Sequence, residues 1–138
     1  MKRLLPVLPL LLLAGCDTGP YKIAPVSGRV TLNGKPLANV AVTFQPIAPE
    51  GSIDAGPGSS GVTDADGRYT LTLIGKDRKG AVVGKHKVRI TYVPDAGAED
   101  DAPRRFKQLP AKYNSRTTLE CEVPPGGKKD ADFALASP

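Results

Sequence analysis

The sequence predicts an all-β fold: an antiparallel β-sandwich of seven short strands in a single domain. Three observations lead to this prediction. Apolar and polar side chains alternate in short segments, turn residues separate those segments, and no segment shows a convincing helical period. The chain of 138 residues also holds 15 Gly and 14 Pro, a composition that disfavours long helices. Its length suits one domain with one core.

The predicted strands place apolar side chains at every second position, which is the spacing of one face of a half-buried strand. The second predicted strand shows this clearly, because Val40, Val42 and Phe44 share one face. In chain order the seven predicted strands are residues 26–32, 40–45, 60–63, 68–73, 84–93, 117–123 and 130–135.

Turn signals separate these segments. Asn33-Gly34 follows the first strand, and this pair favours a tight hairpin turn. Asp66-Gly67 predicts a second hairpin, between residues 60–63 and 68–73. Two stretches with few large apolar residues or many charges, 47–60 and 95–110, are predicted as long loops.

The N-terminus has the pattern of a secretory signal. Lys2 and Arg3 are basic, and the ten residues Leu4 to Leu13 are apolar. A helix needs about 20 residues to cross a bilayer core, and Pro6 and Pro9 further disfavour a spanning helix. The segment is therefore predicted to be a cleavable signal peptide.

Leu13-Ala14-Gly15-Cys16 follows this segment and resembles the lipobox of bacterial lipoproteins. The resemblance implies cleavage before Cys16 and fatty acylation of that cysteine, which would attach the chain to a membrane. The domain plan is then a signal peptide at 1–15, a lipidated tether at 16–25 and a sandwich at 26–138. An ordinary secretory signal with an incidental cysteine is the alternative.

Removal of the signal changes the charge. The whole chain carries 19 basic and 14 acidic side chains, and loss of Lys2 and Arg3 leaves 17 − 14 = +3. A charge of this size suits a soluble surface and does not indicate a nucleic-acid partner.

Residues 26–44 and 62–71 carry the motifs of a known family. Gly28, Val30, Gly34 and Pro36 lie in the first motif, and the second contains Thr63-Asp64-Ala65-Asp66-Gly67. The pattern resembles the carboxypeptidase regulatory-like domain, which implies a prealbumin-like (transthyretin-like) sandwich over residues 26–135. Residues 80–90 and 109–114 are similar to small planctomycete lipoproteins. These motifs are turns and core positions, so they inform the fold and not an activity.

Candidate catalytic and metal-binding residues are few. The Asp64–Gly67 segment lacks the Glu that a calcium loop needs at its twelfth position, so it is predicted to be a turn. His86 has no Ser or Cys at a catalytic spacing and is predicted to be structural. Cys121 alternates with Glu120 and Glu122 and is predicted to face the core. The sequence therefore predicts no enzyme, no metal and no cofactor.

A possible partner site lies in the second long loop. Arg104, Arg105 and Lys107 surround Phe106, and Tyr113 follows. Such loops on a rigid sandwich often carry recognition. The alternative is a solvated loop whose cations offset the acidic run at residues 99–101.

The function expected from these observations is that of a lipid-anchored extracytoplasmic protein of the bacterial cell envelope, with a non-catalytic structural or binding module. Its expected partners are the membrane and a protein or polysaccharide of the envelope. The alternative is a regulatory or inhibitory subunit of an envelope enzyme.

Overall fold

The computed structural model of the protein describes residues 20–93 and 109–137. Within these residues the chain forms short strands in three sheets, and its one short helix is the 3-10 turn η1 (Ala111–Tyr113). The strands are β1 (Ile23–Ala24), β2 (Ser27–Leu32), β3 (Lys35–Pro36), β4 (Val40–Pro46), β5 (Ser59–Val62), β6 (Arg68–Thr70), β7 (Thr72–Leu73), β8 (Ala81–Val82), β9 (Gly84–Tyr92), β10 (Glu120–Val123) and β11 (Phe133–Leu135).

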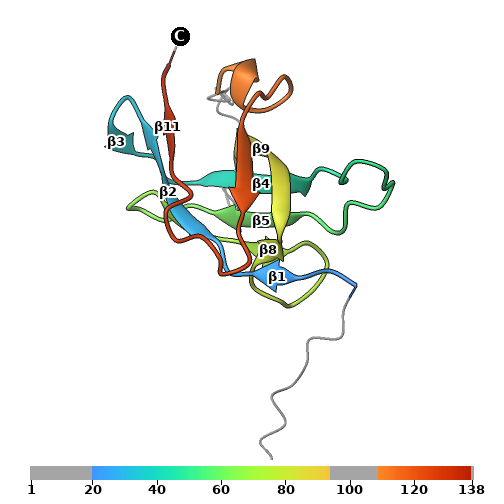
Figure 1. Cartoon of the computed structure of the whole chain (residues 1–138). Coiled ribbons are helices and arrows are strands. Elements are labelled where there is room, and N and C mark those ends of the chain that lie inside the picture. The colour runs from blue at the N-terminus through green and yellow to red at the C-terminus, as the bar shows by residue number, and fades with distance from the viewer. Residues whose placement is uncertain (1–19, 94–108, 138) are drawn as a thin grey trace, which may run out of the picture.

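Two larger sheets form the sandwich (Figure 1). One sheet has the antiparallel order β10-β9-β4-β5-β7, and the other is built on β2, which pairs with β11, β3 and β6. The core lies between them: the ring of Phe44 from β4 meets the ring of Phe133 from β11 edge-on at 6.2 Å. The predicted all-β sandwich is confirmed.

The alternation of β4 and β9 fixes their inward faces. Val40, Val42 and Phe44 are fully buried while the residues between them are not, as predicted. In β9 the buried positions are His86, Val88 and Ile90. Apolar residues on these faces leave water together, and that burial drives the two sheets to pack.

The Asn33-Gly34 turn has the predicted hairpin geometry. Asn33 has φ 52° and Gly34 has φ 83°, the left-handed values that a type I′ turn requires. The turn joins β2 to β3 and places Leu32 opposite Lys35.

The strand count and direction differ from the prediction. Eleven strands form in residues 20–93 and 109–137 where seven were expected, because β1, β3 and β8 are additional two-residue strands and the predicted strand 68–73 divides into β6 and β7. In addition, β11 runs parallel to β2. An alternating pattern identifies the buried face of a strand but does not specify the direction of its neighbour.

The predicted hairpin around Asp66-Gly67 keeps its turn but not its pairing. Strand β6 pairs with β2 in one sheet, whereas β7 pairs with β5 in the other. The chain crosses between the sheets at Leu71, which is fully buried and whose N–H donates to the carbonyl of Val26 at 3.0 Å.

The predicted tether at residues 16–25 is too long at its C-terminal end. Ile23 and Ala24 form β1, which pairs with β8, and Ala24 is only 1% exposed. A two-residue strand is too short to show an alternating pattern, so the sequence did not reveal it. The part of the tether before Pro20 lies outside the described residues.

Gly28 lets the C-terminal segment approach β2. A β-carbon at Gly28 would lie 2.0 Å from the carbonyl oxygen of Ala131. That oxygen also accepts a hydrogen bond from the buried hydroxyl of Tyr69, and the N–H of Ala131 donates to Ser27. The segment before β11 can take this path only where β2 has no side chain.

We therefore expect Gly28→Ala to lower the free energy of unfolding by about 1–3 kcal/mol, because the chain must move to make room for the methyl group. Gly126→Ala is the matched control, since nothing lies within 4 Å of its β-carbon position. Urea unfolding of both variants measures the difference. Equal stability of the two variants would show that the close approach at Gly28 is not a constraint.

Candidate functional site

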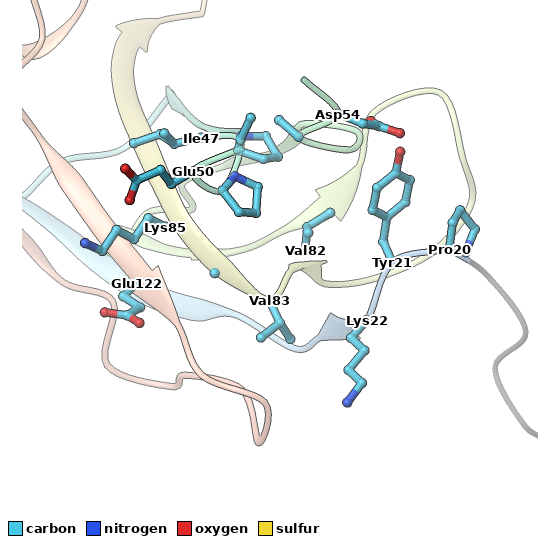
Figure 2. Close-up of a pocket in the computed structure, with 15 residues that line it drawn as sticks. Pro20, Tyr21, Lys22, Ile47, Glu50, Asp54, Val82, Val83, Lys85 and Glu122 are labelled. Carbon is cyan, nitrogen blue, oxygen red and sulfur yellow. The ribbon is translucent and has the colours of Figure 1, made fainter. Parts of the chain in front are cut away.

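A cleft of about 650 Å³ lies beside the N-terminal strand. Figure 2 shows the residues that line it. They come from residues 20–22, the loop segments 46–50 and 54–55, the β8–β9 connection at 82–85, and Glu122 of β10.

Main-chain hydrogen bonds hold the walls of this cleft. The N–H of Val83 donates to the carbonyl of Lys22 at 2.8 Å, which extends the β1–β8 pairing toward the N-terminus. On the other side, the N–H of Ile47 donates to the carbonyl of Lys85 at 2.9 Å and extends the β4–β9 ladder. Both walls are therefore continuations of sheet pairing and not independent loops.

Tyr21 links the N-terminal segment to the loop after β4. Its hydroxyl faces Asp54 in Figure 2, and the hydrogen bond to that carboxylate raises the pKa of the Tyr21 hydroxyl. Asp54 is itself held in a turn, because its Oδ1 accepts from the N–H of Gly56 at 3.2 Å and its N–H donates to Ser52 Oγ. The Tyr21–Asp54 contact closes one end of the cleft.

The cleft combines apolar side chains with charges of both signs. Val82, Val83 and several Pro and Ala residues are among the apolar lining residues. Two lysines and three carboxylates stand among the lining residues, none of which is Ser, Thr, Cys or His. Such a surface can bind an extended apolar segment, and it offers no nucleophile–base pair of the Ser–His or Cys–His kind.

His86 lies under this region, with its side chain fully buried. Its Nε2 is 2.6 Å from the carbonyl oxygen of Val82 and must carry the proton, because a carbonyl only accepts. Nδ1 has no hydrogen-bond partner within the described part of the chain, and the ring packs near Phe44 at 5.4 Å. Burial lowers the pKa of His86, and the bond to Val82 offsets part of that effect.

Cys121 faces the core as predicted, but it is only half-buried. It lies in β10, an edge strand of the five-stranded sheet, opposite His86 of β9. An edge strand has a neighbouring strand on one side only, which explains the incomplete burial of Cys121. Burial raises the pKa of the Cys121 thiol, which disfavours the reactive thiolate.

The predicted partner patch is only partly described. Arg104, Arg105, Phe106 and Lys107 lie outside the described residues. Tyr113 is described and is 8% exposed; the N–H of Ala136 donates to its hydroxyl at 3.0 Å. Tyr113 therefore packs η1 onto the C-terminal segment, and its buried ring is not available to a partner.

The Asp64–Gly67 segment forms the predicted turn. Asp64 Oδ1 accepts from the N–H groups of Asp66 at 2.9 Å and Arg68 at 3.0 Å.

Across residues 20–93 and 109–137, no three His, Cys, Asp or Glu side chains gather to hold a metal ion. In the same residues no helix is long and apolar enough to cross a membrane.

The sequence did not predict the cleft. Residues 20–22 fell within the expected tether, and residues 47–55 fell within the expected loop 47–60. The available signal was local: Tyr21 and Ile23 are large apolar residues in a segment otherwise rich in Pro and Gly. The pairing of β1 with β8 and the hydrogen bond between Tyr21 and Asp54 bring these two segments together.

Compared with known proteins, the chain matches no family model and no curated protein. Among solved structures it is similar to the dioxygenase domain of a dioxygenase–carbohydrate-binding protein fusion from the cellulolytic bacterium Streptomyces sp. SirexAA-E. The identity is 22% and the TM-score 0.40, over 88% of this chain and 84% of that one. A likeness at this TM-score supports no conclusion about function.

The lowered pKa of the buried His86 is expected to make the free energy of unfolding depend on pH. Its pKa is lowered in the folded protein, so below its unfolded pKa of about 6.5 the unfolded chain takes up a proton before the folded one does. Folding stability is then lost as the pH falls, with a slope of at most about 1.4 kcal/mol per pH unit for one proton.

Urea unfolding between pH 7.5 and 5 measures this slope. His86 is the single histidine of the chain, and His86→Gln keeps an N–H donor for Val82 without titrating. We expect the variant to lose less stability than the wild type over this range. Parallel pH profiles would contradict the assignment.

Proposed function

We propose that the protein is a bacterial lipoprotein anchored to a membrane through Cys16, and that its extracytoplasmic β-sandwich is a non-catalytic binding module of the cell envelope. The observation that carries the proposal is the Leu13-Ala14-Gly15-Cys16 motif after a ten-residue apolar segment. Each CH₂ group that an acyl chain buries in the membrane contributes about 0.8 kcal/mol to binding, so two or more acyl chains give lasting attachment.

The short distance between Cys16 and the sandwich supports a membrane-proximal role for the cleft. Pro20 lines the cleft and lies four residues after Cys16, and four residues span at most about 14 Å. A lipid anchor at Cys16 would keep this face of the sandwich next to the headgroups.

Two observations support binding over catalysis. The cleft has no Ser, Thr, Cys or His among its lining residues. The motifs at residues 26–44 and 62–71 resemble the carboxypeptidase regulatory-like domain, a non-catalytic companion domain. The proposed partner is a protein or a polysaccharide of the envelope.

Lipid attachment is tested by expressing the full chain in a bacterium fed with a labelled fatty acid. We expect Cys16→Ala to abolish the label, because the acceptor thiol is lost. Cys121→Ala is the matched control, since it removes the other of the two cysteines and is expected to keep the full label.

Mass spectrometry of the wild type is expected to give a mature chain that begins at Cys16. Equal label in Cys16→Ala and the wild type would refute the anchor.

A further inference from the structure

A second hollow, of about 550 Å³, lies on the sheet built from β2 and β6, and its lining is polar. Three of its side chains are cations: Arg29 of β2, Arg68 of β6, and Lys129 of the segment before β11. Asp132 is the one carboxylate among the lining residues, so the hollow carries three positive charges against one negative charge.

The two arginines are direct cross-strand partners. The register of β2 and β6 places Arg29 opposite Arg68, and both side chains are exposed. Like charges in this arrangement destabilise a strand pair. An anion bound between the two side chains would remove that repulsion.

The carboxylates near the three cations form hydrogen bonds with main-chain N–H groups or pair with another lysine. Asp132 Oδ1 accepts from the main-chain N–H of Arg29 at 2.8 Å, and Asp64 Oδ1 accepts from the main-chain N–H of Arg68. Asp130 pairs with Lys128 at 3.3 Å. Within the described residues, no ion pair joins Arg29, Arg68 or Lys129 to an acidic side chain.

Arg29 is also held in place. Its Nε donates to the carbonyl oxygen of Asp66 at 2.9 Å, which leaves its terminal amino groups for a ligand. A guanidinium fixed in this way loses less rotamer freedom on binding, and its fork can hold a carboxylate or sulfate through two hydrogen bonds.

We propose that this hollow binds the anionic groups of an acidic polysaccharide, with Arg29, Arg68 and Lys129 holding a carboxylate or sulfate. Ser27 and Thr70 also line the hollow, and hydroxyl side chains of this kind can form hydrogen bonds with the hydroxyl groups of a sugar. The inference rests on the proposed binding-module function and names its ligand class.

The other polyanions fit the hollow less well. A binding site for single-stranded nucleic acid needs exposed aromatic rings on which the bases stack. Tyr69 is only 3% exposed, and its hydroxyl donates a hydrogen bond to the carbonyl of Ala131. Membrane insertion needs exposed large apolar side chains, and none lines this hollow.

Binding of the full chain to polygalacturonate, dextran sulfate and neutral dextran tests the proposal, measured by calorimetry at low ionic strength. We expect binding to one or both acidic polymers and none to dextran; the preferred polymer identifies the anionic group. The double variant Arg68→Gln/Lys129→Gln is expected to bind at least about tenfold more weakly. Its thermal unfolding should change little, because exposed charges contribute little to stability.

The control is Lys76→Gln/Arg116→Gln, which removes two exposed cations outside the hollow and keeps the same net charge as the test variant. We expect it to bind like the wild type. Equal weakening of both double variants, or no binding of either acidic polymer, would overturn the site. Equally tight binding of single-stranded DNA would overturn the polysaccharide assignment, and so would binding of anionic lipid vesicles that the Arg68→Gln/Lys129→Gln variant loses. None of these results affects the fatty-acid label at Cys16, so the two proposals fail separately.

Discussion

The backbone of Ala24 and Pro25 lies between two glycines that leave no room for a side chain. A β-carbon at Gly80 would lie 2.6 Å from the carbonyl oxygen of Ala24, and one at Gly127 would lie 2.6 Å from that of Pro25. This close packing lets β1 pair with β8 and lets the N–H of Lys128 donate to Pro25 at 2.9 Å. The N-terminal segment is thereby part of the sandwich.

The cleft beside β1 depends on this packing of the N-terminal segment. Strand β8 supplies Val82, which is the register partner of Ile23 and whose carbonyl accepts a hydrogen bond from Nε2 of His86. The same pairing brings Tyr21 to Asp54 and so forms the cleft between the N-terminal segment and the loop after β4 (Figure 2). An anchor at Cys16 would therefore pull on a segment that is part of the domain, and it would keep the cleft on the membrane-facing side.

The sequence predicts the parts of the fold that depend on side-chain pattern. The alternation of Val40, Val42 and Phe44 identified β4, and Asn33-Gly34 identified the hairpin turn between β2 and β3, because burial and backbone conformation are local properties of those residues. The β1–β8 pairing, the parallel strand β11, the cleft and the polar hollow depend on main-chain contacts between distant segments. Arg29 and Arg68 are unremarkable surface residues until the register places them opposite each other.

If Cys16 carries a lipid, the orientation of the domain relative to the membrane can be measured directly with tryptophan, because the chain contains none. Ile53→Trp places a probe on the loop next to the cleft, where Ile53 is fully exposed; Lys35→Trp places one on β3, at the opposite end of the sandwich from β1 (Figure 1). Both lipidated chains are bound to vesicles that carry spin-labelled headgroups. The account predicts strong quenching at residue 53 and weak quenching at residue 35. Equal quenching at the two positions would contradict it.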